Sequence, residues 1–172
     1  MNDYVILDTE TTGLGINDEV IELGIIDMSG QVLYGGMFNP TVPISPGAQN
    51  IHGISIKDVE GAVRFRDEWF NIARILHGRK VLIYNATFDV RMLNQTARKF
   101  GFPDLIEKDN AFCVMRGYAK YHGKLNSKTG KPQWIKLENA LRYEGIPTFQ
   151  THRATDDCLM TLALIKKTGR IW

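Results

Sequence analysis

The amino-terminal part of the chain alternates apolar runs with polar turns, a pattern that predicts strands. The first run, Tyr4 to Leu7, is short and apolar, as is typical of a buried strand. Two further strand-like runs cover residues 19–28 and 31–38, and Met28-Ser-Gly-Gln31 is predicted as the turn between them. We therefore expect an antiparallel meander whose first strand ends at polar residues.

Helical and strand patterns alternate through the rest of the chain. A proline-rich loop with Pro40, Pro43 and Pro46 follows the meander and leads into the segment Ile51-His52-Gly53-Ile54. Beyond it the pattern predicts a helix over residues 67–77, a strand over 81–84, a helix from 85 to about 100, helices over 113–121, 137–143 and 153–168, and a polar loop over 123–133. This order indicates an α/β fold with a mixed sheet flanked by helices.

The composition is that of one globular domain spanning residues 1–172. Of the 172 residues, 44% are hydrophobic and 23% are charged, enough for a sizeable core. We expect no signal peptide and no membrane span, since no apolar run approaches the roughly 20 residues that a span needs. Cys113 and Cys158 lack metal-ligand spacing, so we expect reduced core cysteines in a cytoplasmic protein. The net charge of +2 is too small to indicate nucleic-acid binding.

Four carboxylates and one histidine stand where apolar runs end or helices begin. They are Asp8, Glu10, Asp89, Asp157 and His152. Carboxylates brought together repel, and each costs several kcal/mol to bury without a partner, so a bound divalent cation is the usual remedy. Hard oxygen ligands without a Cys/His cluster favour Mg²⁺ or Mn²⁺ over zinc. The pattern therefore points to metal-assisted phosphodiester hydrolysis.

The spacing of these residues indicates how the work is divided among them. Asp8 and Glu10 are two apart on a strand, so their side chains share one face. Five residues turn a helix by about 500°, so His152 and Asp157 cannot share a helix face, and we expect His152 on the preceding loop. Two cations would clamp the reacting oxygens, with Asp8 bridging them, Glu10 and Asp157 on the nucleophile side, and Asp89 on the leaving-group side. His152 would then be the general base.

Four segments, taken in order, resemble the motifs of the DEDDh 3′–5′ exonucleases, the superfamily that includes the proofreading epsilon subunit and exonuclease X. They are Asp8-Thr-Glu10-Thr-Thr-Gly13-Leu14, Ile51-His52-Gly53-Ile54, Asn85-Ala-Thr-Phe88-Asp89 and His152-Arg-Ala154-Thr-Asp-Asp157. The resemblance implies a ribonuclease-H-like fold with a mixed five-stranded sheet. It also implies four metal-binding carboxylates with a histidine base, Thr11 and Leu14 near the terminal nucleotide, and His52 and Asn85 beside the reacting strand.

The same resemblance implies hydrolysis of single-stranded or frayed DNA 3′ ends to nucleoside 5′-monophosphates with two divalent cations. An exoribonuclease of the same superfamily is the alternative, since that choice depends on contacts to the 2′-OH. Simpler roles are open for several residues: Thr11 could belong to a turn, His52 could cap or fill a loop, and Asn85 could cap a helix. No segment resembles the polymerase-binding tail of the epsilon subunit, so the chain fits a free-standing enzyme or an excised domain, and a polymerase or repair partner stays open.

One segment departs from the family pattern. Five lysines and no acidic residue lie between Lys120 and Lys136. Lys124, Lys128 and Lys131 suit a phosphate track, and Trp134 suits a base-stacking surface. The alternative is a solvated loop with Trp134 packed on the next helix.

Two other functions explain the sequence less well. A haloacid-dehalogenase-type phosphatase would have Asp in place of Glu10 and leaves His152 without a role. A non-catalytic nucleic-acid-binding module would not need all five catalytic positions filled, as they are here.

Overall fold

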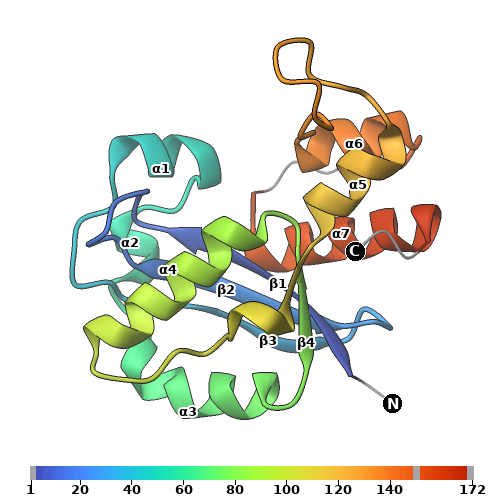
Figure 1. Ribbon diagram of the computed structural model, residues 1–172. Coiled ribbons are helices and arrows are strands. Elements are labelled where there is room, and N and C mark those ends of the chain that lie inside the picture. The colour runs from blue at the N-terminus through green and yellow to red at the C-terminus, as the bar shows by residue number, and fades with distance from the viewer. Residues whose placement is uncertain (1–2, 149–151, 170–172) are drawn as a thin grey trace.

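The fold is built on a five-stranded mixed sheet, described by a computed structural model over residues 3–148 and 152–169. The strand order is β3-β2-β1-β4-β5; β1, β2 and β3 are antiparallel, and β4 and β5 run parallel to β1. The strands are β1 (Tyr4–Thr11), β2 (Val20–Asp27), β3 (Val32–Met37), β4 (Lys80–Ile83) and β5 (Ala111–Cys113). The sheet confirms the predicted mixed α/β architecture (Figure 1).

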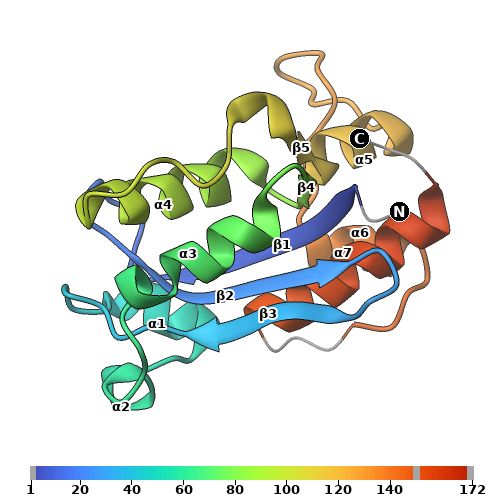
Figure 2. The ribbon, with the colours of Figure 1, turned by 90° about the horizontal axis from the view of Figure 1, so that it is seen from below.

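Helices cover both faces of this sheet (Figure 2). They are α1 (Pro46–His52), α2 (Ile56–Val59), α3 (Phe65–Leu76), α4 (Ala86–Lys99), the short 3-10 turn η1 (Lys108–Asn110), α5 (Val114–His122), α6 (Leu137–Tyr143) and α7 (Ala154–Thr168). Within the described residues, none of these helices is both long and apolar enough to cross a membrane.

The alternation of side chains along β1 assigns a separate core to each face. Val5 and Leu7 pack with α3 and α4 in one core, whereas Ile6 packs with α5, α6 and α7 in the other. Because β1 is buried on both faces, it needs a continuous apolar run, which is why its sequence does not alternate. Asp8 and Glu10 follow Ile6 at intervals of two, so they belong to the α7 face.

The apolar pattern does not predict every element. The proline-rich segment contains α1, which begins at Pro46, where the Ser45 hydroxyl accepts a hydrogen bond from the Ala48 N–H at 3.2 Å. Gly53 ends this helix with a left-handed φ of 73°. Strand β5 is only three half-buried residues at the sheet edge, too short to produce a recognisable period.

Candidate active site

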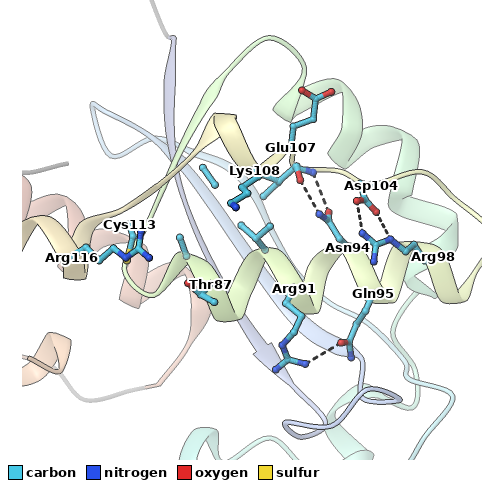
Figure 3. A pocket seen from close by; sticks show the side chains of 14 residues that line it. Thr87, Arg91, Asn94, Gln95, Arg98, Asp104, Glu107, Lys108, Cys113 and Arg116 are labelled. Atoms are coloured by element: carbon cyan, nitrogen blue, oxygen red, sulfur yellow. Dashed lines mark hydrogen bonds and ion pairs between the residues drawn. The ribbon is translucent and has the colours of Figure 1, made fainter. Parts of the chain in front are cut away.

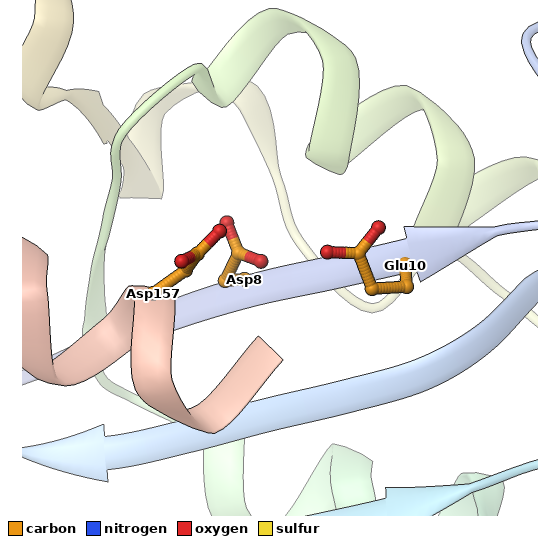
Figure 4. Close-up of side chains that lie close together, drawn as sticks. All are labelled: Asp8, Glu10 and Asp157. Atoms are coloured by element: carbon orange, nitrogen blue, oxygen red, sulfur yellow. The ribbon is translucent and has the colours of Figure 1, made fainter. Parts of the chain in front are cut away.

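Three carboxylates from two distant segments meet at one point of the sheet. Asp8 and Glu10 lie on β1, and Asp157 lies in the first turn of α7. One carboxylate oxygen of each lies within 4.8 Å of the others, so the group could hold a metal ion (Figure 4). Three of the four carboxylates that the sequence analysis proposes as metal ligands therefore lie in a single cluster.

Residues that the sequence did not single out bring α7 to this position. Gly24 of β2 allows the close approach, because a Cβ there would lie only 2.7 Å from the backbone of Ala154 and Thr155. The Glu22 carboxylate accepts hydrogen bonds from Arg153 Nε at 2.9 Å, Arg153 Nη2 at 2.7 Å and the Ala154 N–H at 3.1 Å. Glu22 thus fixes the chain on either side of the start of α7.

Burial and mutual repulsion perturb the carboxylates strongly. Burial raises the pKa of Asp8 well above its usual range, and the charges of Asp89, Asp157 and Glu10 raise it further. Burial is also the first cause that raises the pKa of Glu10 to about 9 and that of Asp157 to about 6. The charge of Arg153 lowers the Glu10 pKa, but its guanidinium is bonded to Glu22. A cluster of this kind suits a divalent cation, which would stabilise the ionised forms.

Asp89 lies beside this cluster but is held by a different contact. It is buried in the first turn of α4, and its Oδ1 accepts hydrogen bonds from the Thr9 N–H at 3.2 Å and from Thr9 Oγ1 at 2.8 Å. Burial raises the pKa of Asp89 to about 7, although the Thr9 hydrogen bonds act in the opposite direction. Thr9 is two residues from Leu7, so it faces the α4 side of the sheet, and α4 approaches β1 from that side. Nothing in the sequence marked Thr9 as a partner.

His152 borders a cleft of about 540 Å³ together with Asp157. It is exposed, it precedes α7, and its φ is 45°, in the left-handed region that residues other than glycine rarely adopt. The structure therefore places His152 on a loop and Asp157 inside the helix. The remaining walls come from α1, the start of α6 and their neighbours, namely Asn50, Ile51, Lys136, Leu137, Glu138, Thr148 and Met160.

His52 is bonded within the protein through both ring nitrogens. Its Nδ1 accepts from the Ile54 N–H at 3.0 Å, which leaves Nε2 protonated to donate to the Thr11 carbonyl at 3.1 Å. Burial lowers the pKa of His52, in keeping with a neutral ring. The side chain of Thr11 is likewise used locally, donating to the Gly13 carbonyl at 2.9 Å. These contacts favour the structural alternative for His52 and leave its ring nitrogens no bond to substrate.

Leu14, on the turn after β1, and Asn85, at the start of α4, both have exposed side chains. Leu14 is 75% exposed on the turn after β1, and Ile16 on the same turn is 86% exposed. Asn85 is the N-cap residue of α4, as predicted, although its side chain makes no capping hydrogen bond. Both side chains are accessible to a ligand.

Lys124, Lys128 and Lys131 are exposed on the segment before α6, and Trp134 is 65% exposed. This exposure argues against the alternative in which the indole packs on the following helix. None of the four side chains lines the cleft that contains His152.

A second hollow of about 610 Å³ lies between α4 and residues 104–116 (Figure 3). Arg98 and Asp104 pair across its wall, with Nη2 2.5 Å from Oδ2. None of the four clustered or neighbouring carboxylates lines it. Of these four carboxylates, Asp157 lines the cleft that contains His152.

Comparisons with known proteins agree with this arrangement. Residues 5–165 match the exonuclease family of the RNase T type. The uncharacterized exonuclease CP81 of Escherichia phage 186 is 35% identical over 169 residues, which cover 95% of this chain and 87% of that protein. The epsilon subunit of DNA polymerase III from Rickettsia felis is also 35% identical, over 96% of this chain and 73% of the subunit.

Solved structures show the same fold at lower identity. Exonuclease X in complex with 5′ overhanging duplex DNA superposes with a TM-score of 0.67 at 23% identity, covering 94% of this chain and 88% of that one. E. coli Exonuclease I in complex with a dT13 oligonucleotide gives a TM-score of 0.79 at 19% identity, but the match spans only 42% of its length. These neighbours establish a ribonuclease-H-like fold for the described chain.

Proposed function

Because the chain belongs to the exonuclease family of the RNase T type, we propose that it hydrolyses single-stranded or frayed DNA from the 3′ end and releases nucleoside 5′-monophosphates. The observation that supports this most directly is the convergence of Asp8, Glu10 and Asp157 within 4.8 Å. Such a set of hard oxygen ligands is suited to phosphodiester chemistry with Mg²⁺ or Mn²⁺.

The residues divide the proposed chemistry as follows. Asp8, Glu10 and Asp157 would hold one divalent cation, and Asp8 with Asp89 a second. When bound, such ions supply positive charge for the attacking and leaving oxygens of an in-line displacement. The His152 imidazole takes the proton of the attacking water. The exposed position of His152 on the rim of the cleft allows it to reach a substrate there.

The contact between Glu22 and Arg153 holds the backbone next to His152, the proposed general base. Arg153 follows His152 directly, and its guanidinium is held by two hydrogen bonds to one oxygen of Glu22 at 2.9 and 2.7 Å. The loop is therefore fixed one residue after the histidine, while the histidine itself stays exposed. We propose that Glu22 and Arg153 are positioning residues that keep His152 over the carboxylates.

The proposed polarity and substrate draw on two further supports. The exposed side chain of Leu14 can press against a terminal base, and separating one base from its neighbour costs a few kcal/mol, so frayed ends should react faster. Exonuclease I and Exonuclease X, the structural neighbours, are described in complex with DNA, which favours DNA over RNA as the substrate. Hydrolysis of RNA by the same site is the competing possibility.

One digestion experiment tests the proposal. Oligonucleotides labelled at the 5′ end, as single-stranded DNA, duplex DNA with paired or mismatched 3′ ends, and short RNA, are incubated with Mg²⁺ or Mn²⁺. A descending ladder, with mismatched ends cut faster than paired ends, is expected for DNA. A covalently closed single-stranded circle has no end and should survive; efficient cutting of the circle would overturn the exonucleolytic assignment. The Asp8→Asn variant controls for contaminating nucleases.

A further inference from the structure

A lysine-bearing hairpin connects α5 to α6 and projects away from these two helices (Figure 1). We call residues 123–134 the lysine hairpin. Its two arms pair through a bridge between Leu125 and Pro132. The Asn126 N–H donates to the Lys131 carbonyl and the Gln133 N–H to the Lys124 carbonyl, each at 2.8 Å. The segment is therefore a short antiparallel hairpin and not an irregular loop.

The tip of the lysine hairpin is fixed by local hydrogen bonds. The Asn126 Oδ1 accepts from the N–H groups of Lys128 at 2.9 Å and Thr129 at 3.1 Å. The Asn126 carbonyl accepts from the Gly130 N–H at 2.9 Å, and Gly130 has a left-handed φ of 66° that suits glycine. Such a turn presents its side chains in a set direction, which lowers the entropy that binding would cost.

The charge on this hairpin is of one sign. Lysines stand at positions 120, 124, 128, 131 and 136, all are exposed, and no acidic residue lies between the first and the last. Within residues 3–148 and 152–169, none of the five ammonium groups forms an ion pair. Ammonium groups without a carboxylate partner are available to phosphates, and binding them releases counterions from a nucleic acid.

An aromatic side chain lies next to these charges. Trp134, 65% exposed, borders a hollow of about 400 Å³ together with Asn126, Thr129, Lys131, Pro132 and Gln133. An exposed indole beside a cation is suited to stacking on a nucleobase whose phosphate the cation contacts. A solvated loop has no need of an exposed tryptophan at its base.

The base of the lysine hairpin is joined directly to the wall of the active-site cleft. The Ile135 carbonyl accepts a hydrogen bond from the Tyr84 hydroxyl at 2.7 Å, and Tyr84 immediately precedes Asn85. The next residue, Lys136, lines the cleft together with His152 and Asp157. Trp134 and Lys136 are two residues apart, at most about 7 Å along the chain. A nucleic-acid strand that leaves the cleft past Lys136 would therefore reach the lysine hairpin next.

We propose that the lysine hairpin binds the single strand on the 5′ side of the scissile phosphodiester, with Trp134 stacked on a base and Lys124, Lys128 and Lys131 in contact with phosphates. This inference rests on the proposed exonuclease function and adds a second substrate-binding surface to it. The hairpin retains long strands between successive cuts, whereas dinucleotides, too short to span from the cleft to the hairpin, do not use it.

The test compares long and short substrates in one triple variant. Lys124→Ala/Lys128→Ala/Lys131→Ala is measured beside Lys57→Ala/Lys166→Ala/Lys167→Ala, which removes the same charge from exposed positions on α2 and α7. Binding to a long single strand is measured by fluorescence anisotropy with chelator, and turnover with Mg²⁺. The hairpin variant should reduce the slope of log affinity against log salt by about 2, from about 0.7 for each lost contact. Its KM for long strands should rise while dinucleotide hydrolysis is unchanged.

The outcomes separate the hairpin from the active site. An unchanged salt slope in the hairpin variant, or an equal change in the α2/α7 variant, would overturn the phosphate-contact proposal while leaving exonuclease activity intact. If the wild-type protein binds long strands through the hairpin but hydrolyses neither long strands nor dinucleotides, the proposed function fails and the binding surface stands.

A substitution at Trp134 tests the stacking contact separately. Trp134→Ala should weaken long-strand binding about 5- to 150-fold, whereas Trp134→Phe, which keeps an aromatic face, should retain most of it. The melting temperature of Trp134→Ala should stay near that of the wild type because the side chain is exposed. A drop in melting temperature with unchanged affinity would instead show a packing role and overturn the stacking proposal.

Discussion

Two exposed segments flank the active site and are held in opposite ways. The turn after β1, residues 12–19, carries the exposed Leu14 and is bonded to α4: Gln95 Nε2 donates to the Gly15 carbonyl at 3.0 Å and to the Asp18 carbonyl at 2.6 Å. The lysine hairpin has its arms and tip held by bonds within itself and is joined to the body at its base. The turn is therefore fixed to the helix that carries Asp89, whereas the hairpin is stabilised mainly by hydrogen bonds within itself.

The turn after β1 is bonded to α4 because this helix also positions a carboxylate of the site. Helix α4 carries Asp89 in its first turn, and Arg91, Gln95 and Lys99 follow on one side of the same helix at intervals of four residues. Arg91 Nη2 lies 3.3 Å from the Leu14 carbonyl, and Lys99 Nζ lies 2.5 Å from Glu19 Oε1. One helix therefore positions both a carboxylate and the turn that carries Leu14. A hairpin that contacted the DNA strand upstream of the cut, as proposed, would not need this precision.

The largest expected effect comes from substitutions in the cluster of Asp8, Glu10 and Asp157. Asp8→Asn and Asp157→Asn should each reduce kcat to near background, because the ligands act as a unit. The double variant should be little worse than either single one, since losses within such a unit are not additive. Single-turnover kinetics with circular dichroism as a folding control checks this. Asp8→Asn activity near that of the wild type would remove the proposed metal site.

The next effect concerns His152, the proposed general base. His152→Ala should lower kcat by about 10²–10⁴-fold with little change in the affinity for a single strand, because the imidazole acts on water. Glu22→Gln, which weakens the hold on Arg153 without touching His152, should lower kcat by a smaller factor. Measuring kcat and strand affinity for both variants checks the order. Equal turnover for the wild type and His152→Ala would exclude the histidine from the reaction.

Metal removal should expose the repulsion within the cluster as a loss of stability. Carboxyl groups titrate near pH 4 when unfolded, but burial is the first cause that raises the pKa of Glu10 to about 9, Asp89 to about 7 and Asp157 to about 6. The folded state therefore binds more protons in this range, so the metal-free protein loses stability as the pH rises from about 4 to about 9.

A bound cation should offset that loss, so Mg²⁺ should raise the melting temperature more at pH 8 than at pH 5. Thermal melts with Mg²⁺ and with chelator at both pH values measure the difference. The Asp8→Asn variant is the control, since it lacks one ligand and should show a smaller metal-dependent shift. A shift of equal size at both pH values would contradict the linkage to these carboxylates.

Parts of this arrangement follow from local sequence and parts do not. The place of Asp8 and Glu10 on one face of β1 follows from strand alternation, and the start of α7 follows from the angular mismatch between His152 and Asp157. These are properties of a few neighbouring residues, and the structure agrees with both. The identification of the family rested on motif order, and the match over residues 5–165 confirms it.

Contacts between segments that are distant in the chain could not be predicted from the sequence. Gly24 matters only because α7 crosses β2 at that point, and Thr9 matters only because α4 covers its face of the sheet. His52 resembles a substrate-binding histidine in its motif, but the nearby backbone of Thr11 and Ile54 uses both ring nitrogens. In each case the partner is chosen by tertiary packing, which no local pattern encodes.

The smallest effect tests the contrast between the two segments directly. Gln95→Ala removes two hydrogen bonds to the turn after β1, each worth about 0.5–1.5 kcal/mol, and leaves the carboxylates untouched. Leu14 would then be held less firmly against the terminal base, so the preference for mismatched over paired 3′ ends should fall a few-fold with dinucleotide turnover preserved. Arg98→Ala is the matched control, because Arg98 lies on α4 but pairs with Asp104 away from the turn. The rate ratio for mismatched and paired ends, measured in both variants, checks the prediction. If the two variants changed this ratio equally, the turn would not depend on Gln95, and the two segments would differ in contacts but not in function.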